Sequence, residues 1–124
     1  MFHILMSLSR KSGTEFNALL IDSVDEAISE VLGGRVTRAF WYHYQAFLGI
    51  GRDEMPDHLD KLFSSLKGMF GVGGETLGRV IVKKLYAKAN IPLELKPDRT
   101  LTEYATALKQ TLSQDPTQTL SAKK

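Results

Sequence analysis

Hydrophobic residues recur with a helical period from Leu19 onward. Between residues 22 and 33 they occupy one face, at intervals of three or four, with acidic and hydroxyl side chains between them. These apolar positions are Val24, Ala27, Ile28, Val31 and Leu32. Ser23 and Glu26 have the spacing of a capping box, which predicts that the helix begins there. The glycine pair at 33–34 predicts its end.

The segment 35–48 is predicted to be a second helix and has an unusual number of aromatic side chains. They are Phe40, Trp41, Tyr42, Tyr44 and Phe47, with His43 among them. Because apolar groups lie on most sides, we expect this helix to be central and to contact several neighbours. The alternative is a cofactor pocket with His43 as an axial ligand. No second ligand is suitably spaced, so we expect no bound cofactor.

The pattern predicts two more amphipathic helices, at 57–70 and 75–89. Pro56 suits the first turn of the earlier one, and Asp57 and Asp60 suit the positive end of its dipole. Together with His58 these acids also suggest a metal site, but capping and solvation explain them equally well, so no metal site is expected. In the later helix, apolar residues occupy one half of the helical wheel and basic residues the other. The apolar residues are Leu77, Ile81, Val82, Leu85, Tyr86 and Ala89.

A fifth helix is predicted at 100–113, after a linker that contains Pro92 and Pro97. Thr100 and Glu103 form a second capping box. A narrow apolar stripe follows, made of Leu101, Tyr104, Ala105, Leu108 and Leu112. This helix either closes the bundle or packs on a partner, and in the second case Leu101, Leu108 and Leu112 are the candidate partner-binding residues.

The predicted fold is therefore all-α, a compact bundle of four main helices with a fifth at the C-terminal side. Residues 19–113 form one helical domain, with its core at 21–91 and the additional helix at 100–113. Residues 1–18 are a short strand, a helical extension or an arm, and the polar run 114–124 is predicted to be disordered. The opening run lacks the order of a signal peptide, and no segment is long enough to span a bilayer, so we expect a cytoplasmic protein.

Composition narrows the candidate chemistry. The 124-residue chain contains no cysteine, which excludes disulfides, a thiol nucleophile and thiolate metal sites. The glycine-rich stretch 71–79 lacks the Lys-Ser/Thr pair of a nucleoside-triphosphate loop, and it follows a predicted helix instead of the strand that dinucleotide binding requires. Without a hydrolase motif or paired buried carboxylates, an enzyme is not expected, and no catalytic residues are assigned.

Charge is concentrated in one region. Between Lys61 and Lys88 there are six basic residues and one acid, although the formal net charge of the whole chain is only +2. With Leu66, Met69 and the sequence Gly-Val-Gly at 71–73, this region resembles a helix-hairpin-helix element, although Phe70 replaces the usual proline and Leu77 the usual small residue. The resemblance implies non-sequence-specific DNA binding through backbone amides and basic side chains. The residues concerned are Gly71, Gly73, Gly74, Arg79, Lys83 and Lys84. The other interpretation is that the glycines turn the chain and the lysines solvate an outer face.

A second resemblance covers residues 21–91. This stretch resembles the Nitrososphaeria output domain, a small helical module of archaeal signal-transduction proteins. The resemblance rests on the order Asp25-Glu26-Ala27, Leu32-Gly33, Tyr42-His43-Tyr44, Pro56, Phe70-Gly71 and Lys83-Lys84-Leu85-Tyr86. The resemblance implies a non-enzymatic role at the end of a signalling pathway and offers no catalytic residues. The expected function is protein–protein interaction, with DNA binding as the alternative. Homodimerisation through the N-terminal run or the fifth helix is a third interpretation.

Overall fold

The structure is a computed structural model that describes the backbone of residues 2–113 and the side chains of residues 15–113. All its regular elements are helical. They are α1 (Phe2–Leu32), α2 (Gly34–Leu48), the 3-10 helix η1 (Arg52–Asp57), α3 (Leu59–Phe70), α4 (Val72–Ala89) and α5 (Leu101–Ser113). The predicted all-α class is confirmed, and the predicted tail at 114–124 lies outside the described residues.

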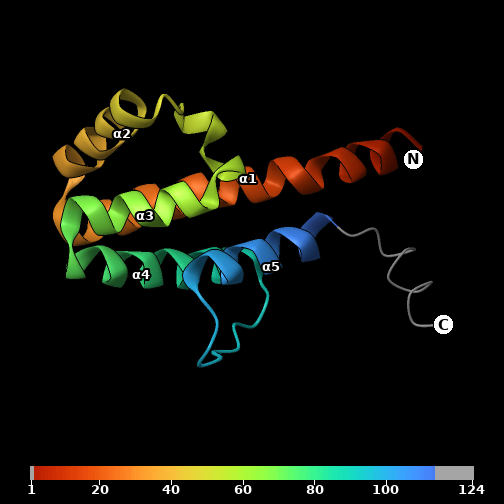
Figure 1. Ribbon diagram of the computed structural model, residues 1–124. Coiled ribbons are helices and arrows are strands. Elements are labelled where there is room, and N and C mark those ends of the chain that lie inside the picture. The colour runs from red at the N-terminus through yellow and green to blue at the C-terminus, as the bar shows by residue number, and fades with distance from the viewer. Residues whose placement is uncertain (1, 114–124) are drawn as a thin grey trace.

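Four helices, α1, α3, α4 and α5, lie alongside one another and enclose a single core (Figure 1). α4 and α5 run opposite to α1 and α3 (Figure 1). α5 is part of this bundle because Tyr104, Ala105 and Leu108 are buried in the core. The fifth helix therefore closes the bundle. Among the described helices, none is long and apolar enough to cross a membrane.

α1 is longer than predicted, and the predicted start at Ser23 is wrong. Of the three alternatives for the opening run, the backbone is a helical extension from Phe2. Ser23 lies in the middle of the helix, where its hydroxyl donates to the carbonyl of Leu19 at 2.7 Å. The helix continues toward the N-terminus because Phe16 and Leu20 are fully buried on the same face as the later apolar residues.

α2 is peripheral, so the prediction of a central aromatic helix is wrong. Among the described elements, its main packing partner is α1, and it rises away from the bundle (Figure 1). Its buried residues, Thr37, Phe40 and Tyr44, lie on one face at intervals of three and four. Of the remaining aromatics, Trp41 is half-buried against the core, whereas Tyr42 and Phe47 are exposed, because packing mainly against one helix cannot bury every aromatic of α2.

The segment before α3 also differs from prediction. Pro56 lies inside η1, where it and Met55 are buried, and α3 begins only at Leu59. The extended φ of −132° at His58 separates the two helices. Asp57 consequently lies outside α3, and its carboxylate pairs with Lys109 of α5 at 3.5 Å.

The turn between α3 and α4 is tighter than the glycine-rich sequence predicts. Among the glycines of this turn, only Gly71 has a positive φ, of +60°, and α4 begins at Val72, three residues before the predicted start. Gly74 is buried inside the first turn of α4. A Cβ at this position would lie 2.1 Å from the carbonyl oxygen of Leu66, so glycine allows the backbones of α3 and α4 to approach closely.

Candidate functional site

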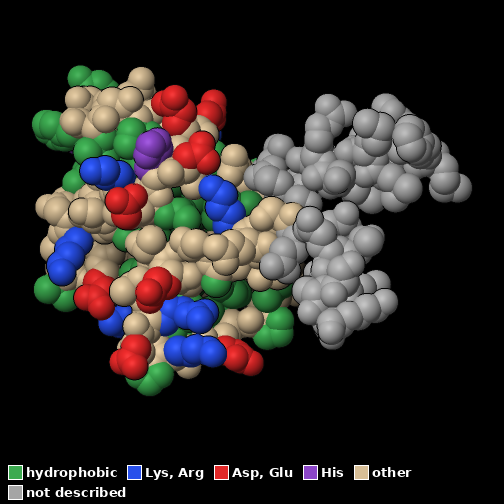
Figure 2. Space-filling model, turned by 45° about the vertical axis from the view of Figure 1, so that its right-hand side comes forward, with side chains coloured by type: hydrophobic (Ala, Val, Ile, Leu, Met, Phe, Trp, Pro, Cys, Tyr) green, Lys and Arg blue, Asp and Glu red, His purple; other side chains and the backbone are tan. Residues whose placement is uncertain are grey.

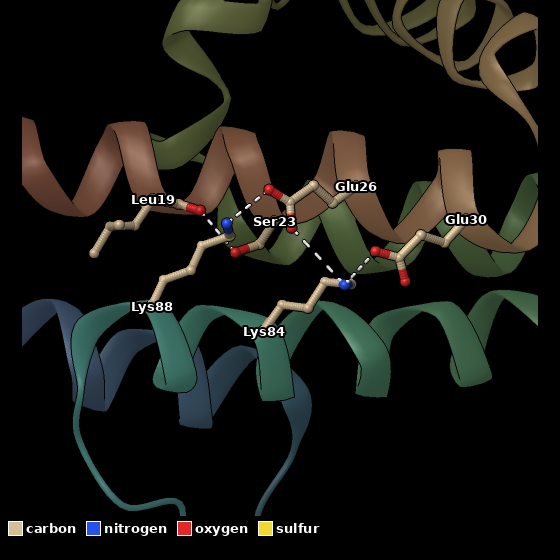
Figure 3. Close-up of polar contacts among 6 residues, drawn as sticks. All are labelled: Leu19, Ser23, Glu26, Glu30, Lys84 and Lys88. Carbon is tan, nitrogen blue, oxygen red and sulfur yellow. Dashed lines mark hydrogen bonds and ion pairs between the residues drawn. The ribbon is translucent and has the colours of Figure 1, made fainter.

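The basic residues of α4 do not form one surface. The Lys84 ammonium lies 2.7 Å from the Glu30 carboxylate and 3.8 Å from Glu26, and Lys88 lies 2.7 Å from Glu26 (Figure 3). Lys84 was predicted on the outer half of the helix with Arg79 and Lys83, but it faces α1. Of the three predicted basic residues, Lys84 therefore faces α1, and Arg79 and Lys83 remain exposed.

The ion pairs between α1 and α4 shift the pKa values of two of the groups that form them. The hydrogen bond from Lys88 lowers the pKa of the Glu26 carboxyl, and Lys84 lowers it further. The hydrogen bond to Glu30 raises the pKa of Lys84. Both shifts favour the charged forms, so the α1–α4 contact is an ion-pair network at neutral pH. These two lysines are already matched with acids, which leaves less positive charge for an external anion.

The glycines predicted to bind phosphate lie in different environments. Gly71 and Gly73 are exposed, whereas Gly74 is buried. The N–H of Gly74 donates to the carbonyl of Gly71 at 2.9 Å, so this amide already has a partner. The burial of Gly74 contradicts its predicted role, because the residue is needed for the α3–α4 contact and does not face solvent.

The three leucines predicted to bind a partner belong to the interior of the bundle. Leu108 is 1% exposed, and Leu101 and Leu112 are partly buried against the core. The narrow stripe on α5 faces α1, α3 and α4 instead of a partner. The prediction that it forms a docking surface is therefore wrong.

Exposed aromatic side chains lie instead on α2. Tyr42 and Phe47 are 72% and 79% exposed. The ring of His43 lies between them, stacked on Phe47 with centroids 5.5 Å apart and edge-on to Tyr42 at 5.6 Å. Figure 2 shows apolar side chains at the surface in the region of α2, at the upper left. These three rings form a continuous aromatic surface.

Positive charge accompanies the aromatic surface. Arg35 and Arg38 are exposed, and α2 contains no acidic residue. Neither arginine forms an ion pair within the described part of the chain. We call the surface made of Arg35, Arg38, Tyr42, His43 and Phe47 the α2 face.

Polar contacts fix the orientation of α2 on α1. The indole N–H of Trp41 donates to the Asp25 carboxylate at 2.6 Å, and the Arg52 guanidinium pairs with the same carboxylate. The Arg52 guanidinium also lies over the Trp41 ring, 5.5 Å from its centroid. A hydrogen bond of 2.7 Å joins the hydroxyls of Ser29 and Thr37. These contacts hold the buried face of α2 against α1 and direct the α2 face toward solvent.

The sequence contained a signal for this surface. This signal covers Tyr42 and His43, which fall outside the helical period of the buried residues Thr37, Phe40 and Tyr44. Phe47 continues that period, three residues after Tyr44, so its exposure has no such signal in the sequence. The number of aromatic residues alone predicts a core helix. Assigning each aromatic residue to a face of the helix shows that there are more of them than one neighbouring helix can bury.

Within the described side chains, no group of three or more His, Asp or Glu residues is placed to hold a metal ion. Comparison with family models, curated proteins and solved structures gives no match to the chain. The resemblance to the Nitrososphaeria output domain therefore stays a prediction.

Proposed function

We propose that this protein is a non-enzymatic signal-transduction module that acts by binding another protein through the α2 face. The observation that carries the proposal is the exposure of Tyr42 and Phe47 on a helix whose main neighbour is α1. Exposed aromatics that form a continuous surface are typical of interaction sites, and buried aromatic and arginine anchors dominate binding energy. The signalling role rests on the resemblance described above.

The chemistry of the α2 face indicates the kind of partner. Two arginines and no acid on this helix favour a partner with acidic side chains. The aromatic rings favour apolar anchors on the partner, and a helical face suits an amphipathic helix that lies along it. The proposed partner segment is therefore an apolar helix flanked by Asp and Glu.

DNA binding by α4 is the less favoured alternative. Lys84 and Lys88 are paired with acids of α1, and the amide of Gly74 is hydrogen-bonded within the chain. Figure 2 shows acidic and basic side chains interspersed over the face in view. Extended contact with a phosphate backbone favours an uninterrupted basic surface.

A displayed library of helical peptides tests the proposal. We expect selection on the wild-type protein to enrich peptides with apolar positions every three or four residues and flanking acids. Tyr42→Ala with Phe47→Ala removes both exposed anchors and should weaken binding by about tenfold or more. Arg35→Glu with Arg38→Glu should also weaken the acidic peptides.

Val72→Ala is the matched control, because Val72 is 87% exposed but lies on α4. It should leave the affinity unchanged. Enriched peptides that bind the Tyr42/Phe47 variant as tightly as the wild type would refute the α2 face as the docking surface. Circular dichroism of each variant shows whether the helices are retained.

A further inference from the structure

A second surface feature lies on another side of the molecule, lined by residues of α3, α4, the linker 90–100 and the start of α5. The linker, these two helices and the start of α5 enclose a groove of about 990 Å³. Its apolar floor includes Phe63, Val82, Leu93 and Leu101. Leu101 reaches the floor because Gly78 has no side chain: a Cβ there would lie 2.5 Å from a methyl group of Leu101.

Basic side chains from three segments surround this floor. They are Lys67 of α3, Arg79 and Lys83 of α4, and Lys96 and Arg99 of the linker. Two acids, Asp60 and Glu75, also line the groove, and Glu75 pairs with Arg79 at 2.9 Å. The other four cations form no ion pair within residues 15–113. The groove therefore combines an apolar floor with excess positive charge.

The linker that carries two of these cations is held in place by tyrosines. The Tyr104 hydroxyl accepts the backbone N–H of Lys96 at 2.6 Å and donates to the Lys96 carbonyl at 3.1 Å. The Tyr86 hydroxyl in turn donates to the backbone carbonyl of Tyr104 at 2.6 Å. The Arg99 guanidinium lies over the Tyr104 ring, 5.6 Å from its centroid. These contacts fix the backbone at Lys96 and the side chain of Arg99, so less ordering is needed when a ligand binds.

We propose that this groove binds a phosphorylated organic ligand of about nucleotide size. Basic residues from three segments that line one groove suit a phosphate group, which carries more charge than a single carboxylate. The apolar floor suits the flat or aliphatic part of such a ligand, and the volume falls within the roughly 300–1,000 Å³ of small-molecule sites. The acids at Asp60 and Glu75 interrupt the basic lining, which disfavours a long polyanion. This site uses different residues from the α2 face, so each proposal can fail without the other.

The probe is ATP labelled on its ribose with a methylanthraniloyl group, titrated with the full chain at low salt and followed by fluorescence anisotropy. We expect saturable binding that unlabelled ATP displaces. Lys83→Glu and Arg99→Glu should each weaken binding by about tenfold, because each reverses a charge at the groove. Both residues are exposed, so helicity should be retained.

Arg38→Glu is the matched control, since it makes the same charge change on α2 and should leave the affinity of the probe within about twofold of the wild type. Equal weakening by the control would overturn the proposal, because net charge alone would then explain binding. Absence of binding at millimolar probe would also overturn it. Displacement by inorganic tripolyphosphate as effective as by ATP would overturn the organic part of the assignment.

Discussion

Gly73 and Gly74 are adjacent in the sequence but have opposite requirements. A Cβ at Gly73 meets no atom within 4 Å, whereas at Gly74 it would lie 2.1 Å from a backbone oxygen of α3. Gly74→Ala should therefore lower the free energy of unfolding by about 3 kcal/mol, because the helices must separate. Gly73→Ala should change it by no more than about 1 kcal/mol, and stabilisation is expected from helix propensity.

Urea unfolding of both variants, followed by circular dichroism, measures this difference. Equal losses of stability would show that the close α3–α4 contact does not require Gly74. The two glycines thus distinguish a packing role from the phosphate-binding role that the sequence predicted for both.

Tyr44 places a hydroxyl in the core with no hydrogen-bond partner in the described part of the chain. Burial, with a smaller contribution from the Asp60 carboxylate, raises the pKa of Tyr44 to about 12. Because the folded pKa exceeds the unfolded value of about 10, the protonated form is favoured by folding. The associated stability is present below pH 10 and is lost as the pH rises toward 12.

At pH 7, Tyr44→Phe should leave the free energy of unfolding unchanged or raise it by at most roughly 1 kcal/mol. Between pH 10 and 12 the variant should lose less stability than the wild type. Thermal unfolding at pH 7 and pH 11 measures both effects. A clear loss of stability at pH 7 would mean that the hydroxyl has a partner that stabilises the fold.

At the scale of elements, two adjacent lysines of α4 lie in different surroundings. Lys84 faces Glu26 and Glu30 of α1, whereas Lys83 faces the groove. Lys84→Glu places three acids together and should lower the melting temperature. Lys83→Glu, an identical charge change one residue away, should leave it nearly unchanged.

Glu30→Lys combined with Lys84→Glu restores an opposite-charge pair and should recover part of the loss. Melting curves of the single and double variants test this interaction. No recovery would show that the loss comes from something other than the ion pairs. Because Lys83→Glu is expected to leave the melting temperature nearly unchanged, it tests DNA binding without the loss of stability that Lys84→Glu causes.

Periodicity predicted most elements and much of the core, but not which faces meet. The apolar half of α4, including Leu77, Ile81 and Leu85, was predicted and is buried. The start of α1 was missed because the Ser23–Glu26 spacing also occurs within a helix, whereas the buried Phe16 and Leu20 show that the helix continues toward the N-terminus. The candidate site was missed because periodicity groups residues by face without showing which face has a neighbour.

At the scale of the whole molecule, α2 lies at the edge of the bundle, where it joins the shared core through Phe40 and Tyr44. Its backbone hydrogen bonds are protected mainly by contact with α1, so local opening should require less free energy than opening of α4. We expect amide hydrogens of α2 to exchange faster than those of α4. Asp25→Ala, which removes the acceptor of Trp41 and the partner of Arg52, should accelerate exchange in α2 alone.

Hydrogen exchange followed by mass spectrometry resolves the two helices. Similar rates in α2 and α4 would indicate that the molecule opens only as one unit. A selective effect of Asp25→Ala would place the anchoring of α2 in the Trp41–Asp25–Arg52 contacts.

The Tyr86–Tyr104 hydrogen bond limits where the chain can be cut without breaking a contact of the core. It joins α4 to α5, while Phe16 and Leu20 extend the same core in the other direction. The stretch 21–91, which carries the resemblance, therefore contains only part of this core. We expect residues 21–91 alone to have an incomplete core and an unpaired Tyr86 hydroxyl, so a stable transplant of this domain should also include residues 16–20 and α5.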